Sequence, residues 1–255
     1  MLPRPVTMPV ETLLSVVREE KLGEPHITIA PTAVWRPKDA RREEQVRARQ
    51  EITRLGWLDR RGQVDAEVAA SLAVLCRAAV ECYGWIKDGA RTIAVLAGAI
   101  GREAVLAVRD GDSVSLSQLQ PDADLAAVLV AQLPDLRPAR GRPVTVDKAD
   151  LVAAPDGRVR SDSGMSRPAS VEVRQVQQIA ALPTIGGGEL YVATREGVGR
   201  YRKGIQPLRY ADTEHGRFLN ATMAASNGVT RIVVGPATKR DLVGHLHELR
   251  RSLIV

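Results

Sequence analysis

The stretch Leu208–Pro236 reads LRYADTEHGRFLNATMAASNGVTRIVVGP and alternates β-prone runs with turn formers. The β-prone runs are Leu208–Ala211, Arg217–Thr222 and Thr230–Val234. The turn formers are Asp212, Thr213 and Gly216, then Ser226, Asn227 and Gly228. Asn-Gly between two such runs is a strong hairpin signal, because both residues tolerate the positive φ of a tight turn. The pattern predicts a three-stranded antiparallel meander, followed by a helix at Lys239–Ser252.

A comparable order of elements precedes this meander. The earlier part is expected to contain a helix at Ala66–Arg77, strands at Val80–Ile86, Arg91–Ala97, Glu103–Val108 and Ser113–Ser117, and a helix at Asp124–Leu133. The later part is expected to begin with a helix at Pro168–Ala181 and a strand at Leu190–Ala193. The offset of roughly 100 residues is too long for a solenoid repeat. We therefore expect an α+β protein, a single domain over residues 1–255 with two related halves at about 1–137 and 138–255.

The N-terminal region is expected to be mainly helical. Thr7 is positioned to cap a helix whose apolar residues, between positions 10 and 17, recur every three or four residues. His26–Ala30 alternates like a short strand, and Asp39–Leu55 has the pattern of a charged helix with a thin apolar stripe. Asp65 is expected to cap the helix that follows.

The composition excludes several protein classes. The chain has 255 residues, of which 3% are aromatic, and two cysteines, Cys76 and Cys82, which cannot staple a chain of this length. We expect both to be free thiols of a cytoplasmic protein. No run of ~18 consecutive apolar residues occurs, so no membrane insertion is expected. Pro3, Pro5 and Pro9 interrupt the N-terminus, which argues against a signal peptide.

The net charge of +6 raises a second interpretation, a basic nucleic-acid-binding or regulatory protein. However, basic residues are mixed with acidic ones, and aromatic side chains that would stack on bases are nearly absent. Nucleic acid is therefore not the expected partner. Arg195, Arg200, Arg202 and Lys203 flank two glycines in a basic hairpin tip, which is either a solvated loop or a contact for an acidic partner.

No constellation of residues predicts catalysis, a cofactor or a metal. A hydrolase triad around Asp212 and His215 would need a serine, but the chain has no Gly-x-Ser-x-Gly motif. This third hypothesis requires a pocket that holds His215 and a serine. His245 and His247 lie about 200° apart around a helix and cannot share a metal ion. The run Gly186–Gly188 precedes a strand instead of opening a helix, so we expect a flexible connector and no phosphate loop.

Four motifs are spread over nearly the whole chain. They are GWLD at 56–59 with GQVD at 62–65, AVLAVRDGD at 104–112, DTEHGRF at 212–218 and VVGPA at 233–237. An Ala- and Leu-rich helix follows the first motif, and the closing helix follows the last. Together they resemble the EspG family, the ESX (type VII) secretion-associated proteins of actinobacteria.

The resemblance implies two pseudo-twofold-related halves that share a central antiparallel β-sheet flanked by two helical bundles. It also implies a cytosolic, non-enzymatic chaperone of a type VII secretion system. Such a chaperone binds a PE–PPE-like heterodimer at the exposed hydrophobic tip of its PPE member, keeps it soluble and guides it to secretion. The contact surface implied by the resemblance lies on the sheet and the C-terminal helical bundle, and no residue is carried over as catalytic, metal-binding or cofactor-binding.

We expect two contributions to this partner-binding surface. The first is the hairpin around Trp85 with its turn at Lys87–Thr92, and the second is the helix Val171–Leu182 with the loop Thr184–Glu189. The candidate residues are Tyr83, Trp85, Lys87, Arg91, Val171, Gln175, Gln178, Leu182 and Glu189.

Several alternatives stay open at this point. Burial in the core is the competing interpretation for Trp85. The Lys87–Thr92 connection is short, whereas some family members carry a long loop there that touches the client. The sequence also leaves open which client is bound, which secretion system is served, and whether the empty protein forms a homodimer.

Overall fold

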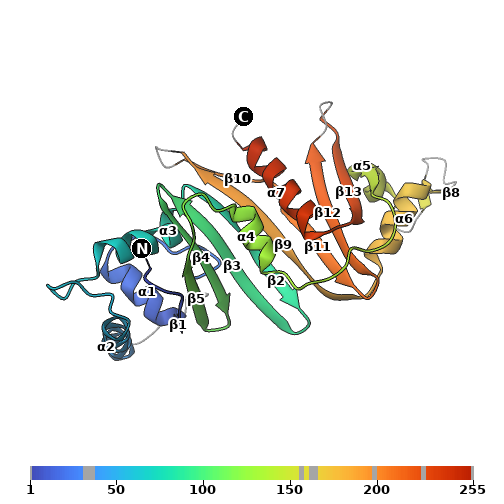
Figure 1. The fold of residues 1–255 in the computed structure, drawn as a ribbon. Coiled ribbons are helices and arrows are strands. Elements are labelled where there is room, and N and C mark those ends of the chain that lie inside the picture. Colours follow the sequence, from blue (N-terminus) through green and yellow to red (C-terminus); the bar gives the residue numbers. More distant parts are fainter. Residues whose placement is uncertain are drawn as a thin grey trace.

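The computed structural model describes residues 2–30, 38–154, 158–160, 166–196, 200–224 and 228–253. Their central feature is an 11-stranded sheet whose paired strands are antiparallel, with helices on its faces and at its ends (Figure 1). The strands are β1 (Val6–Pro9), β2 (Val80–Asp88), β3 (Arg91–Ile100), β4 (Glu103–Asp110), β5 (Ser113–Gln118), β6 (Val144–Asp147), β9 (Thr184–Arg195), β10 (Tyr201–Lys203), β11 (Leu208–Thr213), β12 (Gly216–Ala224) and β13 (Thr230–Pro236). Two short strands, β7 (Arg158–Arg160) and β8 (Ser166–Pro168), form a separate hairpin. The expected α+β fold with a large antiparallel sheet is confirmed.

The helices begin and end close to their expected positions, apart from α5, which the sequence interpretation did not predict. They are α1 (Val10–Glu19), α2 (Lys38–Arg54), α3 (Ala66–Arg77), α4 (Leu125–Ala131), α5 (Lys148–Ala153), α6 (Val171–Ala180) and α7 (Lys239–Ser252). Side-chain caps explain several starts. Asp65 accepts from two backbone N–H groups of α3, Asp124 does the same for α4, and Ser170 caps α6.

The strands follow a symmetric order outward from the middle of the sheet. The central pair is β2 with β9, and Tyr83 lies opposite Tyr191 within it. One side continues β3, β4, β5, β1, and the other continues β11, β12, β13, β6. The outermost strands are therefore β1 and β6, which are the first strands of the earlier and the later part of the chain.

The quoted meander exists and is longer than its β-prone runs. The strands β11, β12 and β13 pair antiparallel in succession. The first turn is tighter than expected, because Asp212 and Thr213 belong to β11 and Gly216 already belongs to β12. Only Glu214 and His215 remain between the strands, and the positive φ of 114° at Gly216 closes the hairpin.

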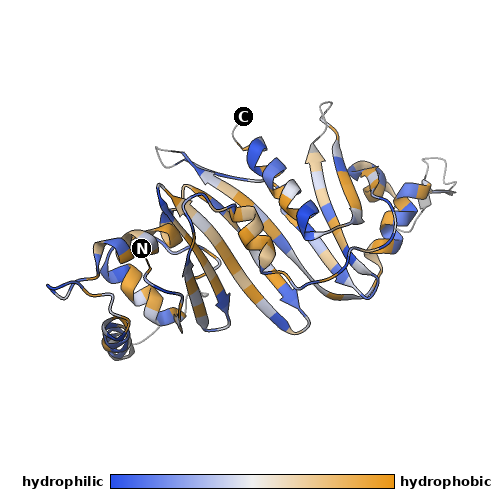
Figure 2. Ribbon diagram, viewed as in Figure 1, coloured by the Kyte–Doolittle hydropathy of each residue, from blue (hydrophilic) through white to orange (hydrophobic). Residues whose placement is uncertain are grey.

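The two faces of the sheet are packed differently. On the covered face, Cys82, Ile86, Leu190 and Val192 form one core with the helices α4 and α7, which lie side by side (Figure 1). On the opposite face, α1 and α3 pack at one end around a core that includes Leu96. The helices α5 and α6 pack at the other end, on β6 and β13. Figure 2 shows hydrophobic residues running through the strands and α4, whereas α2 is largely hydrophilic.

The triglycine segment was predicted wrongly as a flexible connector, and Thr184–Glu189 was predicted wrongly as a loop. Both belong to β9, in register with β2 and β11. A Cβ on Gly188 would lie 2.3 Å from the carbonyl oxygen of Trp85, and one on Gly186 would lie 2.7 Å from that of Lys87. The glycines are therefore explained by the close approach of neighbouring strands.

Two N-terminal expectations are also corrected. His26–Ala30 forms turns instead of a strand. The His26 N–H donates to the carbonyl oxygen of Leu75, and the N–H groups of Ile29 and Ala30 both donate to the carbonyl oxygen of His26. Thr7 lies in β1 and hydrogen-bonds Ser115 at 2.8 Å, while Pro9 occupies the N-cap of α1. The sequence pattern around Thr7 fits a cap and an edge strand equally well.

Some segments of the sequence, among them parts of the expected Asn-Gly turn and basic hairpin tip, lie outside the described residues. They include the region around Trp35, positions 226 and 227 of the Asn-Gly turn, positions 197–199 of the basic hairpin tip, and most of the loop from 154 to 164.

Candidate protein-binding face

The side of the sheet opposite α4 and α7 has an uncovered middle, which we call the open face. It is defined by the cross-strand row Trp85, Glu189, Arg209, Asn220, and by the adjoining row Lys87, Gly187, Ala211, Phe218. Alternation along the strands directs both rows to the same side. The open face lies between α3, which packs on β3 and β4, and α6, which packs on β6.

A cleft of about 600 Å³ occupies the open face beside α6. Trp85 and Lys87 line it from β2, whereas Val176 and Ile179 line it from α6. Phe218 contributes a further apolar wall from β12. An apolar hollow with a few polar side chains at its margin is typical of a binding site.

The glycines of β9 form the floor of this cleft. Gly187 has a φ of 155°, and a Cβ there would lie 2.8 Å from the carbonyl oxygen of Tyr210. Since no side chain projects from Gly187, the space above it stays free. Ala211, the cross-strand neighbour of Gly187, has only a methyl side chain, so little of the cleft is filled at this position either.

A cluster of aromatic rings continues the open face toward α3. Tyr83 and Tyr191 are stacked with centroids 5.2 Å apart, and Trp85 meets both rings edge-on. His26 packs edge-on against Tyr83 at 4.4 Å. Tyr83 is buried, whereas Trp85 and Tyr191 are half-buried. The cluster therefore leaves part of its apolar surface exposed while its innermost ring belongs to the core.

Charged groups contact the Tyr191 side chain of this cluster. The Nζ of Lys203 lies 4.1 Å from the centroid of Tyr191, a cation–π contact. Glu189 accepts hydrogen bonds from Arg209 at 2.8 Å and from the hydroxyl of Tyr191 at 2.8 Å. These bonds, that of Arg209 first, lower the pKa of Glu189. Burial, followed by the bond to Glu189, raises the pKa of Tyr191 to about 12.

The candidate residues chosen from the sequence are only partly brought together. Trp85, Lys87 and Glu189 line the cleft. Tyr83 lies beneath Trp85 with 1% of its surface exposed. Arg91 pairs with Asp88 across the hairpin and alternates away from the open face, where it forms an ion pair with Asp110.

The residues proposed on α6 are distributed differently from those that line the cleft. Val171 begins the helix and is exposed, and Gln175 and Gln178 are absent from the lining, which uses Val176, Ile179 and Ala180. Leu182 lies beyond the helix and borders a second cavity. Both core-facing and cleft-facing residues of α6 are apolar, so periodicity alone identified the helix but not the side that meets the cleft.

Tyr191, Arg209 and Asn220 were missed by the sequence interpretation. Tyr191 could have been found, because β2 and β9 have similar β-prone patterns with a tyrosine on each. Arg209 and Asn220 carry no local signal, since their place on the open face depends on long-range strand register.

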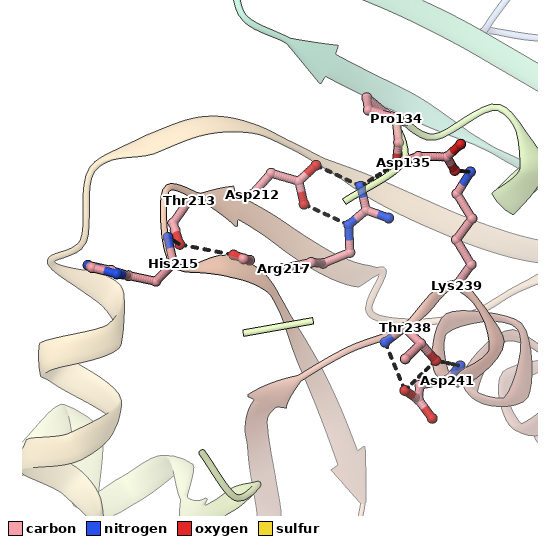
Figure 3. Close-up of polar contacts among 10 residues, drawn as sticks. Pro134, Asp135, Asp212, Thr213, His215, Arg217, Thr238, Lys239 and Asp241 are labelled. Carbon is pink, nitrogen blue, oxygen red and sulfur yellow. Dashed lines mark hydrogen bonds and ion pairs between the residues drawn. The ribbon is translucent and has the colours of Figure 1, made fainter. Parts of the chain in front are cut away.

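The hydrolase hypothesis does not fit the described geometry. Both carboxylate oxygens of Asp212 bind Arg217, at 2.6 and 2.7 Å, and Figure 3 shows the His215 side chain turned away from this pair. The cavity beside His215 is lined by Arg137, Arg140, Leu182 and Phe218, with no serine among these described residues.

The remaining histidines have ordinary partners. His247 lies 2.9 Å from Asp124, across α7 and α4, and His245 lies 3.2 Å from Glu248 on its own helix. None of the helices in the described ranges combines the length and the apolar character needed to cross a membrane.

Comparisons with known proteins found a matching family and similar relatives. A model of the EspG family matches residues 9–248. The ESX-1 secretion-associated proteins EspG1 of Mycobacterium marinum (strain ATCC BAA-535 / M) and Mycolicibacterium smegmatis (strain ATCC 700084 / mc(2)155) are 34% identical over 104 residues and 31% identical over 110 residues. These alignments cover 40% and 42% of this chain, but only 37% and 39% of the relatives. The chain thus spans about two-fifths of the length of the curated relatives it matches.

The fold also matches a solved structure along nearly its whole length. That structure is the Mycobacterium tuberculosis type VII secretion system chaperone EspG5 in complex with the PE25-PPE41 dimer. The TM-score is 0.70 at 15% sequence identity, and the match covers 98% of this chain and 96% of the other. Because the family model spans residues 9–248, far more than half of the sequence, this chain belongs to the EspG family.

Proposed function

We propose that this protein is a cytoplasmic, non-enzymatic chaperone of a type VII secretion system, and that it binds a PE–PPE-like heterodimer on its open face. The observation that carries the proposal is the apolar cleft of about 600 Å³ between α6 and the bare glycine floor of β9. Exposed apolar hollows of this kind mark interaction sites. Family membership and the fold shared with a chaperone of this class support the same reading.

The proposed contact has a chemical logic. A secreted client with an apolar tip would aggregate in water, and covering that tip with a standard-size interface of roughly 1,200–2,000 Å² prevents this. The half-buried rings of Trp85 and Tyr191 suit such a contact, because large aromatic side chains dominate binding energy. Lys87 and Arg209 at the margin supply polar contacts that orient the client.

Two related halves make up the molecule in this proposal. The order of the strands outward from the central β2–β9 pair supports a pseudo-twofold axis between these two strands, with halves at about 1–137 and 138–255. The helices α1 and α3 of the first half then correspond to α5 and α6 of the second, and α4 corresponds to α7. Under this symmetry the open face straddles the axis.

Co-expression tests the proposal. The chain is produced together with a PE–PPE-type pair, and the mixture is analysed by size-exclusion chromatography with light scattering. We expect a stable complex of one copy of each chain, which is lost when apolar residues at the tip of the client are made charged. Free pairs in the presence of folded chaperone would contradict the proposal. The same run shows whether the client-free protein has the mass of a homodimer and whether nucleic acid co-purifies.

A further inference from the structure

A second, more polar cavity of about 410 Å³ lies next to the cleft on the open face. It is lined by Arg137, Arg140, Leu182, His215 and Phe218. Phe218 also lines the cleft, so the two hollows share this ring as a wall. The polar groups of the second cavity are two guanidinium groups and one imidazole, all of them hydrogen-bond donors.

The backbone of Arg217 holds the linker that carries Arg137 and Arg140. Its N–H donates to the carbonyl oxygen of Arg137 at 2.9 Å, and its carbonyl oxygen accepts from the N–H of Ala139 at 3.0 Å. Arg140 follows directly in this linker. The turn that carries His215 is fixed from the other side, because the His215 N–H donates to the hydroxyl of Thr213 at 3.1 Å.

Gly216 permits this close packing of the linker on the turn. A Cβ at this position would lie 2.7 Å from the backbone nitrogen of Ala139 and 2.8 Å from the carbonyl oxygen of Arg137. The segment Asp212–Phe218 therefore shapes the cavity, although only His215 and Phe218 face into it.

Among the described residues, no carboxylate forms an ion pair with the donors of this cavity. Asp212 is engaged with Arg217, and Asp135 is engaged with Lys239 (Figure 3). Within the described ranges, no hydrogen bond or ion pair is seen for the side chains of Arg137, Arg140 or His215. Three exposed donors that converge without an acidic partner form a site complementary to an anionic oxygen group.

We propose that Arg137, Arg140 and His215 form a binding site for a carboxylate or phosphate group, directly beside the client-binding cleft. One source of the anion rests on the proposed function: an acidic side chain of the client. It would enter the second cavity while apolar residues of the client occupy the cleft on the other side of Phe218. The other source of the same chemistry is a free phosphate-containing molecule. Arginine guanidinium groups suit both, since they bind carboxylates and phosphates in a bidentate manner.

The experiment compares two double variants of the full chain. Arg137→Gln with Arg140→Gln removes the proposed donors, and Arg60→Gln with Arg102→Gln removes the same charge from exposed turns elsewhere. Thermal unfolding first establishes that both variants are folded. One arm measures the affinity of the PE–PPE-type pair for each chain, and the other titrates inorganic phosphate by calorimetry and NMR at constant ionic strength.

The expected result is a loss of roughly tenfold or more in affinity for the pair in the Arg137/Arg140 variant, with less than twofold change in the control. This identifies a client carboxylate. Unchanged affinity for the pair, with phosphate binding by the wild type that the Arg137/Arg140 variant loses, assigns the site to a free anion. The proposal is overturned if the Arg137/Arg140 variant keeps both interactions, with the pair and with phosphate. If the pair fails to bind the wild type, the proposed function fails, and the phosphate arm alone decides the anion site.

Discussion

Arg217 forms a buried ion pair with Asp212. Its side chain is fully buried, its guanidinium binds Asp212 with two hydrogen bonds, and it also donates to the carbonyl of Pro134 at 3.0 Å (Figure 3). The Cζ of Arg217 lies 4.9 Å from the ring centroid of Tyr210. Burying a charge is costly, so this pair stabilises the fold only while both partners are present.

Replacing one partner of this pair is therefore expected to be severe. Asp212→Asn leaves the Arg217 charge buried without its counter-charge, and the free energy of unfolding should fall by about 3–5 kcal/mol. The matched control is Asp147→Asn, because Asp147 pairs with Arg231 at 3.3 Å on the surface, where such pairs contribute about 0–1 kcal/mol. Urea unfolding at neutral pH measures both losses. Losses of similar size for the two variants would show that burial does not increase the contribution of the Asp212–Arg217 pair to stability.

The start of α7 provides a pH-dependent contribution at the same scale. Asp241 accepts hydrogen bonds from the hydroxyl of Thr238 at 2.6 Å and from its N–H at 2.8 Å, which completes a capping box (Figure 3). These bonds, that of the hydroxyl first, lower the pKa of Asp241. Because the folded pKa lies below the unfolded value of about 3.9, the stabilisation is present above that pH. It is lost as the pH falls through the folded pKa.

Asp241→Ala is expected to cost about 1 kcal/mol at pH 7, and this cost should shrink as the pH is lowered below about 4. Urea unfolding at both pH values measures the difference from the wild type. Asp122→Ala, at an exposed position in the turn before α4, serves as the control with a small effect at either pH. A cost for Asp241→Ala that is equal at the two pH values would contradict this assignment.

At the scale of elements, the central β2–β9 pair depends on glycine. A Cβ on Gly84 would lie 2.2 Å from the carbonyl oxygen of Glu189 and 3.0 Å from the side chain of Leu190. Gly84→Ala should therefore push the two strands apart and destabilise the protein by roughly 2 kcal/mol or more. Gly244→Ala in α7 is the matched control, since nothing lies within 4 Å of its Cβ position.

The control substitution should have the opposite sign. Alanine in a helix interior is about 0.5–1 kcal/mol more favourable than glycine, so Gly244→Ala should raise the midpoint of thermal unfolding. The two variants can be compared in one thermal unfolding series. If Gly84→Ala were as stable as the wild type, the close approach of β2 and β9 described here would be wrong.

Elements with local signals were predictable from the sequence, and elements defined by distant partners were not. The helices that begin at Ala66 and Lys239 have caps and periodic apolar residues, so their bounds were predicted correctly. The triglycine segment has the local signature of a connector. It becomes a strand because β2 and β11 pair with it on both sides, and local propensity contains no information about those partners.

The candidate site was predictable to a similar extent. Trp85 and Lys87 lie in a strongly β-prone hairpin, and the structure brings both to the cleft. The tip of that hairpin is short, with Asp88 paired to Arg91, as the sequence indicated. Asn220 and Arg209 reach the same cleft only through the register of β9, β11 and β12, which cannot be read from any one strand.

At the scale of the whole molecule, the two faces of the sheet are covered to different extents. The helices α4 and α7 close the covered face, where Leu242 and Leu246 are fully buried. The open face keeps a cleft between α6 and the aromatic cluster of β2 and β9. The central claim of the proposed function is that a PE–PPE-like client binds the open face and leaves the covered face free.

The most direct test places a bulky charge on each face and measures the affinity for the PE–PPE-type pair. Asn220→Arg puts an arginine on an exposed cleft position, and Gly244→Arg puts one on an exposed position of α7. We expect Asn220→Arg to weaken binding by roughly tenfold or more, because it obstructs the cleft, while Gly244→Arg changes it less than twofold. If Gly244→Arg abolished binding and Asn220→Arg left it intact, the client would bind the opposite side of the sheet.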